Sequence, residues 1–131
     1  MLVTSSQVTT LETVVDGYVS VRLAAVQYPI TLVGFADITE PRSETPILGN
    51  LYVHPDLRRL GIATSLLRHA KQWAHKHEKS LYLHVKPDNP SRALYEAEGF
   101  EYTGEVSEEG SLWMVKLAHE GRIAREEEPR A

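Results

Sequence analysis

The sequence contains no cysteine among its 131 residues. Disulfides, cysteine-ligated zinc sites and a cysteine nucleophile are therefore excluded. The chain also lacks an excess of positive charge, because 14 Lys and Arg stand against 18 Asp and Glu, for a net charge of −4. A nucleic-acid surface needs a basic stripe, and these interspersed charges form none. We therefore expect no nucleic-acid partner.

Long apolar runs are missing as well. No run approaches the roughly 18 residues of a membrane span, so we expect no membrane association. Residues 1–5 lack the basic start and apolar stretch of a secretory signal, which predicts a cytoplasmic protein. Six histidines are present, but His69, His75 and His77 do not share a helical face at zinc-like spacing. We expect no metal.

The order of apolar and polar residues predicts one domain that contains both strands and helices. We expect a single domain over residues 1–118 and a charged tail over 119–131. Alternating apolar residues predict three strands within 8–38, with a hairpin turn at Asp16-Gly17 and a break at Pro29. The further predicted elements are a polar loop over 39–46, strands over 47–53 and 81–85, a helix over 61–77, a short helix from Asn89-Pro90 to Gly99, and strands over 101–103 and 112–117.

The most informative stretch joins the predicted strand 47–53 to the helix 61–77. It contains a proline turn, the pair Arg58-Arg59 and then Gly61, where the amphipathic helix begins. The first N–H groups of a helix have no intrahelical partner, and the helix dipole favours an anion at this end. With two arginines alongside, the stretch predicts a phosphate-binding loop.

Arg58, Gly61 and Ala63 follow the spacing of a known motif, and a second motif occurs further along the chain. The first resembles the acetyl-CoA pyrophosphate loop of the Gcn5-related N-acetyltransferase (GNAT) superfamily. The second contains Asn89, the run Leu94-Tyr95-Glu96 and the pair Gly99-Phe100, in the order common in that family. Both motifs occur in the right order with a strand between them. The resemblance covers roughly residues 30–117.

The resemblance implies an α/β (α+β) fold with a mixed, mostly antiparallel sheet of about seven strands, a parallel strand–helix–strand crossover and two main helices. It implies an enzyme that transfers acetyl from acetyl-CoA to a primary amine of a protein, peptide or small molecule, by direct attack in a ternary complex. Tyr95 is then the general acid that protonates the leaving thiolate, and the backbone N–H of Val53 faces the thioester carbonyl. The implied coenzyme contacts are Leu51, Tyr52, Val53, Arg58, Arg59, Leu60, Gly61, Ile62, Ala63, Thr64, Asn89, Arg92 and Tyr95.

The catalytic base is less well marked. Many members of the superfamily carry a carboxylate on the fourth strand, but residues 48–52 offer none. Others carry a glutamate on the fifth strand, at the position of His84. A histidine can serve as a base near neutral pH without tuning, so the base is His84, another residue or water. Either Asp88 or Asn89 fills the asparagine role of the second motif, because the spacing to Tyr95 is one residue short.

The connection between the first two strands is also unusual. Members of the superfamily insert one or two helices there, and these helices wall the acceptor site. Only Asp16-Gly17 is present here, so we expect the N-terminal helices to be lacking and the acceptor side to be open. Such a site suits a protein or peptide amine, or a homodimer partner completes the wall. The missing carboxylate and the missing helices favour an alternative function. The chain would then be a catalytically weak or silent acyl-CoA-binding module that acts through a protein partner.

Overall fold

The computed structural model describes residues 7–15, 18–27, 31–40, 45–59 and 61–118. The predicted turn at Asp16-Gly17, the predicted break at Pro29 and the predicted charged tail over 119–131 lie outside the described residues, as does Leu60. No helix in the described ranges is long and apolar enough to cross a membrane.

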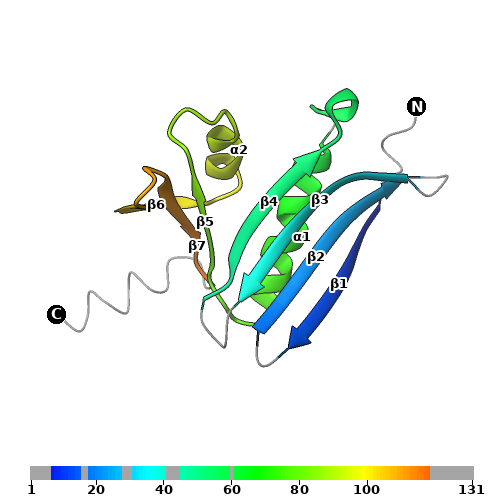
Figure 1. Cartoon of the computed structure of the whole chain (residues 1–131), viewed down its shortest axis with the longest axis horizontal. Helices are drawn as coiled ribbons and strands as arrows, with labels where there is room; N and C mark the ends of the chain where they lie inside the picture. The colour runs from blue at the N-terminus through cyan, green and yellow to red at the C-terminus, as the bar shows by residue number, and fades with distance from the viewer. Residues whose placement is uncertain (1–6, 16–17, 28–30, 41–44, 60, 119–131) are drawn as a thin grey trace.

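The described chain forms one seven-stranded sheet with two α-helices (Figure 1). The strands run in the order β1-β2-β3-β4-β5-β7-β6, and β4 and β5 are the parallel neighbours. All other neighbouring strands are antiparallel. The elements are β1 (Gln7–Val15), β2 (Tyr18–Gln27), β3 (Thr31–Glu40), β4 (Ile47–Val53), a 3-10 turn η3 (Pro55–Leu57), α1 (Ile62–Lys76), β5 (Leu81–Val85), α2 (Ser91–Ala97), β6 (Glu101–Val106) and β7 (Leu112–Lys116).

This architecture confirms the predicted fold class, but two strands are longer than predicted. β3 continues to Glu40, inside the stretch that was predicted as a polar loop, and β6 continues to Val106 instead of ending at 103. Pairing explains both extensions, because Glu40 lies opposite Val19 and Val106 lies opposite Leu112. Ladder hydrogen bonds thus override a locally polar composition. Glu40 is buried, and it forms an ion pair with Lys79.

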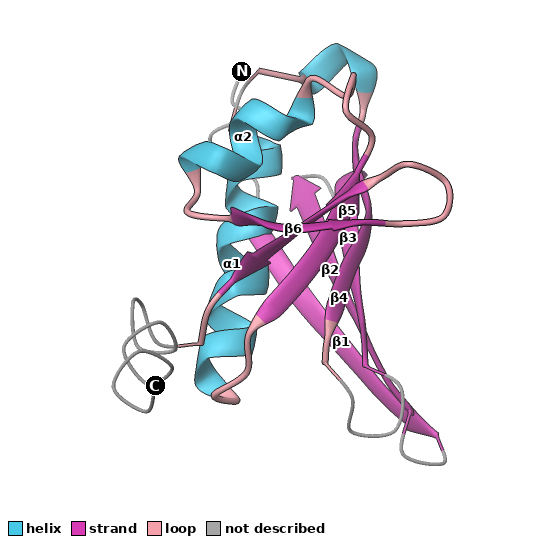
Figure 2. Ribbon diagram, turned by 90° about the vertical axis from the view of Figure 1, so that its left-hand side faces the viewer, coloured by secondary structure: helices cyan, strands magenta, loops and turns pink. Residues whose placement is uncertain are grey.

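Both helices lie on the same face of the sheet (Figure 2). α1 turns one apolar side to the sheet, and its buried residues recur at the spacing of a helical face. These are Ile62, Leu66, Leu67, Ala70 and Ala74. The helix approaches β3 closely at Gly34, where an added Cβ would lie 3.3 Å from side-chain carbons of Ile62 and Leu66 and 2.8 Å from the carbonyl oxygen of Tyr52. The glycine therefore sets how closely the start of α1 can approach the sheet.

The hairpin between β1 and β2 leaves the other face of the sheet open. Val15 pairs directly with Tyr18, so two residues separate the strands and no helix fits between them. This register confirms that the helices expected at this position in the superfamily are lacking. In the described part of the chain, no helix covers the face of the sheet opposite α1 and α2 (Figure 2).

Strands β4 and β5 separate toward the end that leads into α1 (Figure 1). Their one described pair joins Ile47 to Tyr82, near the start of both strands. Beyond it, Asp37 pairs with Gly49 and Phe35 with Tyr52, so Asn50 and Leu51 together oppose a single residue of β3. Such a bulge bends the strand and increases its twist. Asn50 has a φ of 55°, and its side chain donates to Asp37 at 3.2 Å.

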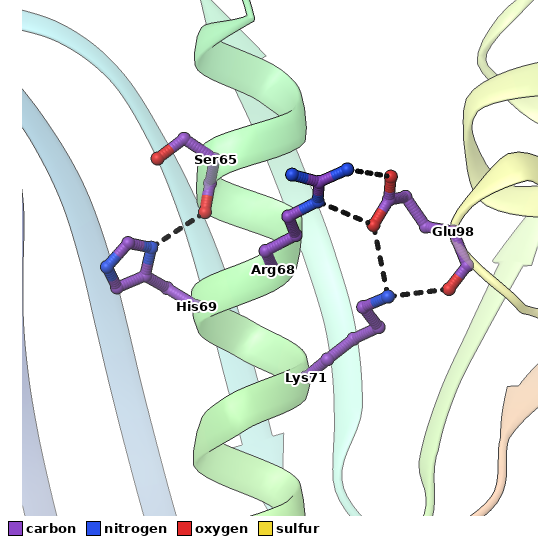
Figure 3. A network of polar contacts seen from close by, with 5 residues as sticks. All are labelled: Ser65, Arg68, His69, Lys71 and Glu98. Atoms are coloured by element: carbon purple, nitrogen blue, oxygen red, sulfur yellow. Dashed lines mark hydrogen bonds and ion pairs between the residues drawn. The ribbon is translucent and has the colours of Figure 1, made fainter. Parts of the chain in front are cut away.

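A polar network ties α1 to the end of α2 (Figure 3). Glu98, which follows α2, accepts hydrogen bonds from Arg68 at 3.0 and 3.2 Å. Lys71 donates to the Glu98 carboxylate at 3.0 Å and to its backbone carbonyl at 2.6 Å. The hydrogen bond from Arg68, followed by the contacts with Lys71, holds the pKa of Glu98 below its ordinary value of 4.5 despite the opposing effect of burial.

We expect Glu98→Gln to lower the free energy of unfolding at pH 7, because it removes the charge that pairs with Arg68 and Lys71. The expected loss is only about 0.5–1 kcal/mol, because solvent screens the exposed side of the network. The Glu98 side chain is 9% exposed, but that of Arg68 is 63% exposed. A lowered pKa stabilises the fold above the unfolded-state pKa, and this contribution disappears as pH falls through the folded-state pKa. The difference between wild type and Glu98→Gln should therefore be full at neutral pH and vanish in acid. Denaturant titrations at pH 7 and pH 3 measure it, and a constant difference would contradict this origin.

Candidate coenzyme and catalytic site

A cleft of about 530 Å³ opens where β4 and β5 separate. Its walls are the end of β4, the turn into α1, the first turn of α1 and the start of α2. It combines apolar side chains from the strand and helices with the two arginines of the turn. The lining residues are Leu51, Tyr52, Val53, Leu57, Arg58, Arg59, Gly61, Ile62, Ala63, Thr64, Asn89, Pro90, Ser91 and Leu94.

The turn between β4 and α1 brings an uncapped helix end into this cleft. Gly61 is the N-cap residue of α1 with a φ of 88°, and no side chain caps the helix there. Its carbonyl accepts the first helical hydrogen bond, from Ser65 N–H at 2.9 Å. The N–H groups of Ile62, Ala63 and Thr64 precede this bond, so they have no intrahelical partner. All three residues line the cleft, and their N–H groups can bind an anion.

The two arginines of the turn take different positions. Arg58 Nε donates to the carbonyl of Val53 at 3.0 Å, which fastens the turn to the end of β4. Arg59 is exposed and lines the cleft, with a φ of 68° in the left-handed region. The backbone of this turn thus takes two left-handed steps, at Arg59 and at Gly61. These steps lead the chain from the strand into the helix beside the cleft.

The N–H of Val53 is directed away from β3. His54 N–H donates to the carbonyl of Val33 at 2.8 Å, so His54 and Val33 form a hydrogen-bonded pair of the antiparallel ladder. Such pairs alternate with pairs whose polar groups point outward. Val53, which pairs with Gly34, belongs to the second type. Its N–H therefore points toward the side where β5 has separated, and it can donate to a carbonyl oxygen bound there.

Most of the predicted coenzyme contacts come together in this cleft. Leu60 lies outside the described residues. Tyr95 and Arg92 are not among the described residues that line the cleft. Arg92 instead donates to the carbonyl of Pro87 at 2.6 Å and to the hydroxyl of Tyr102 at 2.9 Å, with its guanidinium over the Tyr102 ring. The roles of Arg92 and Tyr95 toward the coenzyme stay predictions.

Four cleft residues were not among the predicted contacts: Leu57, Pro90, Ser91 and Leu94. Ser91 and Leu94 are three residues apart on α2, so they lie on the same side of the helix. This spacing was available in the sequence, but the side of the short helix that faces the cleft was not. Leu57 belongs to the 3-10 turn that follows β4.

The N-cap residue of α2 is Pro90, one residue after the predicted Asn89. Asn89 still bonds to the start of the helix. Its side-chain oxygen accepts from Ser91 N–H at 2.8 Å, and its carbonyl accepts from Arg92 N–H at 3.2 Å. The regular helix is assigned from Ser91, which differs by one residue from the predicted start. Asn89 therefore holds the start of α2 in place while lining the cleft.

Tyr95 is buried and is not among the described residues that line the cleft. It is 8% exposed, and its ring packs edge-on against Phe100 with centroids 6.1 Å apart. Burial raises the pKa of the Tyr95 phenol, and a hydrogen bond with the side chain of Ser91 opposes that rise. Ser91 is one helical turn earlier and lines the cleft. The Tyr95 hydroxyl is thus within hydrogen-bond reach of a residue of the cleft wall, and it keeps its proton at neutral pH.

His84 lies on the open face of the sheet. Leu81, Leu83 and Val85 are buried, so the alternate residue His84 faces away from the helices. Its exposed ring packs against the ring of Trp113 with centroids 4.8 Å apart. His84 is not among the described residues that line the cleft. As a base it would have to act from the open face, across the gap between β4 and β5.

Charged and aromatic groups of β2, β3 and β4 contact one another across these three strands. Arg22 forms a bidentate ion pair with Asp37, and its guanidinium lies over the Phe35 ring at 4.4 Å. The Phe35 ring contacts that of Tyr52 with centroids 5.5 Å apart. The carboxylate of Asp37 is therefore occupied by Arg22 and Asn50. It does not stand in for the carboxylate that β4 lacks.

A second hollow, of about 440 Å³, lies by the last turns of α1 and the end of β7. Its lining includes Arg68, Lys71 and Lys79. These cations are already paired with Glu98 and Glu40. It does not adjoin the turn at Gly61, and the anion-binding groups described above belong to the cleft at β4.

The arrangement suits one kind of chemistry. Free N–H groups and arginines at one end of the cleft can hold a pyrophosphate, and the Val53 N–H can polarise a carbonyl at the gap between the strands. The Tyr95 phenol is buried and hydrogen-bonds with Ser91, which lines the cleft. A phosphate-bearing thioester matches these groups.

Comparisons with known proteins agree with the geometry. Residues 15–100 match the model of the acetyltransferase (GNAT) family. No curated protein matches the sequence significantly. Among solved structures, the PaiA N-acetyltransferase of Thermoplasma acidophilum in complex with coenzyme A is 24% identical, with a TM-score of 0.65 over 75% of this chain and 60% of that chain.

Two further structures are similar. An aminoglycoside 6′-N-acetyltransferase complexed with coenzyme A is 20% identical, with a TM-score of 0.66 over 76% of this chain and 73% of that chain. A GNAT-family acetyltransferase of Staphylococcus aureus Mu50 is 16% identical, with a TM-score of 0.64 over 76% of this chain and 68% of that chain. These likenesses agree in fold with the family match, which covers more than half of the sequence. The chain therefore belongs to the GNAT family of acetyltransferases, which are acyltransferase enzymes.

Proposed function

We propose that the protein transfers the acetyl group of acetyl-CoA to a primary amine of a protein, peptide or small molecule. The observation that carries the proposal is the cleft in which the uncapped start of α1, Arg59 and the Val53 N–H face the gap between β4 and β5. Two solved structures of similar fold are N-acetyltransferases that hold coenzyme A. A diphosphate and a thioester require these two kinds of donor.

In the proposed reaction the pyrophosphate binds the N–H groups between Arg59 and Thr64, and the thioester lies at Val53. The amine nitrogen attacks the thioester carbon, and the Val53 N–H stabilises the oxyanion that forms. The C–S bond then breaks, the thiolate takes a proton from Tyr95, and the nitrogen loses its extra proton to the base. The products are an amide and coenzyme A. Most of the catalytic effect comes from positioning both substrates.

The acceptor approaches from the open face of the sheet in this proposal. Tyr52 on β4 and His84 on β5 flank the gap from that side, and no described helix walls it. An open wall admits an amine on a large molecule, which favours a protein or peptide acceptor. A homodimer partner that covers this face would instead restrict the site to small amines.

A second candidate is an acyl-CoA-binding module with little or no activity, acting through a protein partner. Two observations favour it: Tyr95 is buried and is not among the described residues that line the cleft, and the carboxylate of Asp37 on β3 is paired with Arg22. This candidate needs the same cleft but no proton donor.

One experiment separates the two candidates. Purified protein is incubated with acetyl-CoA and a panel of amines that includes peptides with a free N-terminus and with lysine, and products are read by mass spectrometry. An enzyme gives acceptors heavier by one acetyl group and free coenzyme A in equal amounts. Tight binding of acetyl-CoA by calorimetry with no acetylated product would support the silent module. Absence of coenzyme binding would refute both.

We expect His84→Ala to lower turnover near neutral pH by about 10²-fold if His84 is the base. A side-chain base makes the wild-type rate depend on pH, and the variant should lose this dependence. Initial rates across the pH range provide the measurement. His77→Ala, which removes an exposed histidine at the end of α1, is the matched control and should keep the wild-type profile. An unchanged profile in His84→Ala would assign the role to another residue or to water.

A further inference from the structure

The two edges of the sheet differ in how they are protected. β6, at one edge, carries Glu101 and Glu105, and its pairing with β7 shifts register between Tyr102 and Val106. Charges and irregular pairing keep an edge strand from pairing with another chain. β1, at the other edge, pairs with β2 without a register shift over nine residues. No described strand pairs with its outer side.

The sequence of β1 lacks the usual protective features as well. It contains neither proline nor lysine, and Glu12 is its one charged residue. Its exposed residues include Leu11, Val14 and Val15, which are 66%, 60% and 61% exposed. Such a strand is a template for pairing with another strand.

The register of the hairpin decides which backbone groups of β1 point outward. Val15 pairs with Tyr18 across a two-residue connection, and such a closing pair is hydrogen-bonded. Hydrogen-bonded pairs alternate along an antiparallel ladder, so residues 7, 9, 11, 13 and 15 bond to β2. The N–H and C=O groups of Val8, Thr10, Glu12 and Val14 therefore point away from the sheet.

We propose that β1 pairs antiparallel with β1 of a second copy of this chain, about a twofold axis at Leu11. In this register Val8 lies opposite Val14 of the second copy, and Thr10 lies opposite its Glu12. Every outward-pointing residue then meets an outward-pointing residue, as an antiparallel ladder requires. The sheets of the two copies become one continuous sheet.

Charge and shape favour the same register. Each Glu12 faces a threonine, so no like charges lie opposite each other, whereas a register centred on Glu12 would oppose two glutamates. Leu11 faces Leu11 on the axis, so two exposed leucines meet, and the half-buried Val8 faces the exposed Val14. An interface of this kind is self-complementary, as a twofold dimer must be.

The proposed dimer leaves the acyltransferase cleft accessible. β1 is separated from β4 by β2 and β3, so the second copy does not cover the gap between β4 and β5. The inference therefore stands apart from the proposed function, and the assembly can be tested without any activity measurement.

The absence of cysteine allows a sharp test. Leu11→Cys introduces the one thiol of each chain on the twofold axis, in a pair without ladder hydrogen bonds, where Cα atoms lie about 4.5 Å apart. This separation suits a disulfide. Thr9→Cys is the matched control. In the proposed register the two introduced cysteines would lie four residues, or about 13 Å, apart along the strands. We expect mild oxidation to give a covalent dimer of Leu11→Cys and little of Thr9→Cys on a non-reducing gel.

A second variant tests the backbone pairing. Thr10→Pro removes an outward-pointing N–H without removing a bond to β2, whereas Thr10→Ala keeps that N–H. By sedimentation equilibrium, wild type and Thr10→Ala should be dimers. Thr10→Pro should dissociate about tenfold more readily, with unchanged far-ultraviolet circular dichroism. A monomeric wild type, or crosslinking of Thr9→Cys as efficient as that of Leu11→Cys, would overturn the proposal.

Discussion

Tyr95→Phe is expected to lower turnover by about 10²–10⁴-fold while the affinity for acetyl-CoA changes little. The substitution keeps the ring that packs against Phe100 and removes only the hydroxyl. In the proposed reaction, the thiolate of the leaving coenzyme then lacks its proton donor. Steady-state kinetics gives the loss of turnover, and calorimetry gives the affinity.

The pH dependence follows from the burial of the phenol. Burial raises the pKa of Tyr95 above its ordinary value of 10.0, so the hydroxyl carries its proton throughout the neutral range. An acid acts in its protonated form, which is the form present below its pKa. Titration of Tyr95 should therefore not reduce the rate between pH 6 and the ordinary pKa.

Tyr102→Phe is the matched control for this substitution. The Tyr102 hydroxyl contacts Arg92 and Glu96 outside the cleft, so its loss should leave turnover near that of wild type. Full turnover in Tyr95→Phe would remove the acid role. Together with undiminished coenzyme binding, it would direct attention to Ser91 or water as the proton donor.

Gly61→Val is expected to weaken acetyl-CoA binding by at least about 10²-fold. Gly61 has a φ of 88°, a conformation that a β-branched residue adopts only at a cost of about 1–3 kcal/mol. We expect the valine to relieve this strain by rotating the backbone, which would turn the N–H groups at the start of α1 away from the proposed pyrophosphate site. An added Cβ meets no atom within 4 Å, so the fold itself should remain.

Gly110→Val is the control that separates the effect of backbone strain on stability from the effect on coenzyme binding. Gly110 has a φ of 89°, and its added Cβ also meets no atom within 4 Å, but it lies in the turn between β6 and β7. Both variants should lose similar stability in thermal unfolding, and only Gly61→Val should lose coenzyme affinity by calorimetry. Equal affinities in the two variants would show that the pyrophosphate binds elsewhere.

Local features of the chain determined much of what could be predicted from it. The amphipathic spacing of α1, the turn at Arg58 and Gly61, and the hydrogen bond between Asn89 and the start of α2 depend on residues close together in sequence. Backbone conformation and helix capping follow from such neighbours, so these elements lie within about a residue of their predicted positions. The family motifs are built from the same local elements, and for that reason the cleft contains most of the predicted contacts.

Only the tertiary structure decided which side chains reach the cleft. The bulge at Asn50 lies where β4 separates from β5, and it depends on the register in which β4 pairs with β3. The packing of α2 turns Ser91 and Leu94 to the cleft and buries Tyr95, whereas a motif gives only the spacing of these residues. His84 faces the open side because β5 buries its alternate residues. The direction of the Val53 N–H and the free edge of β1 follow from strand register, which long-range pairing sets.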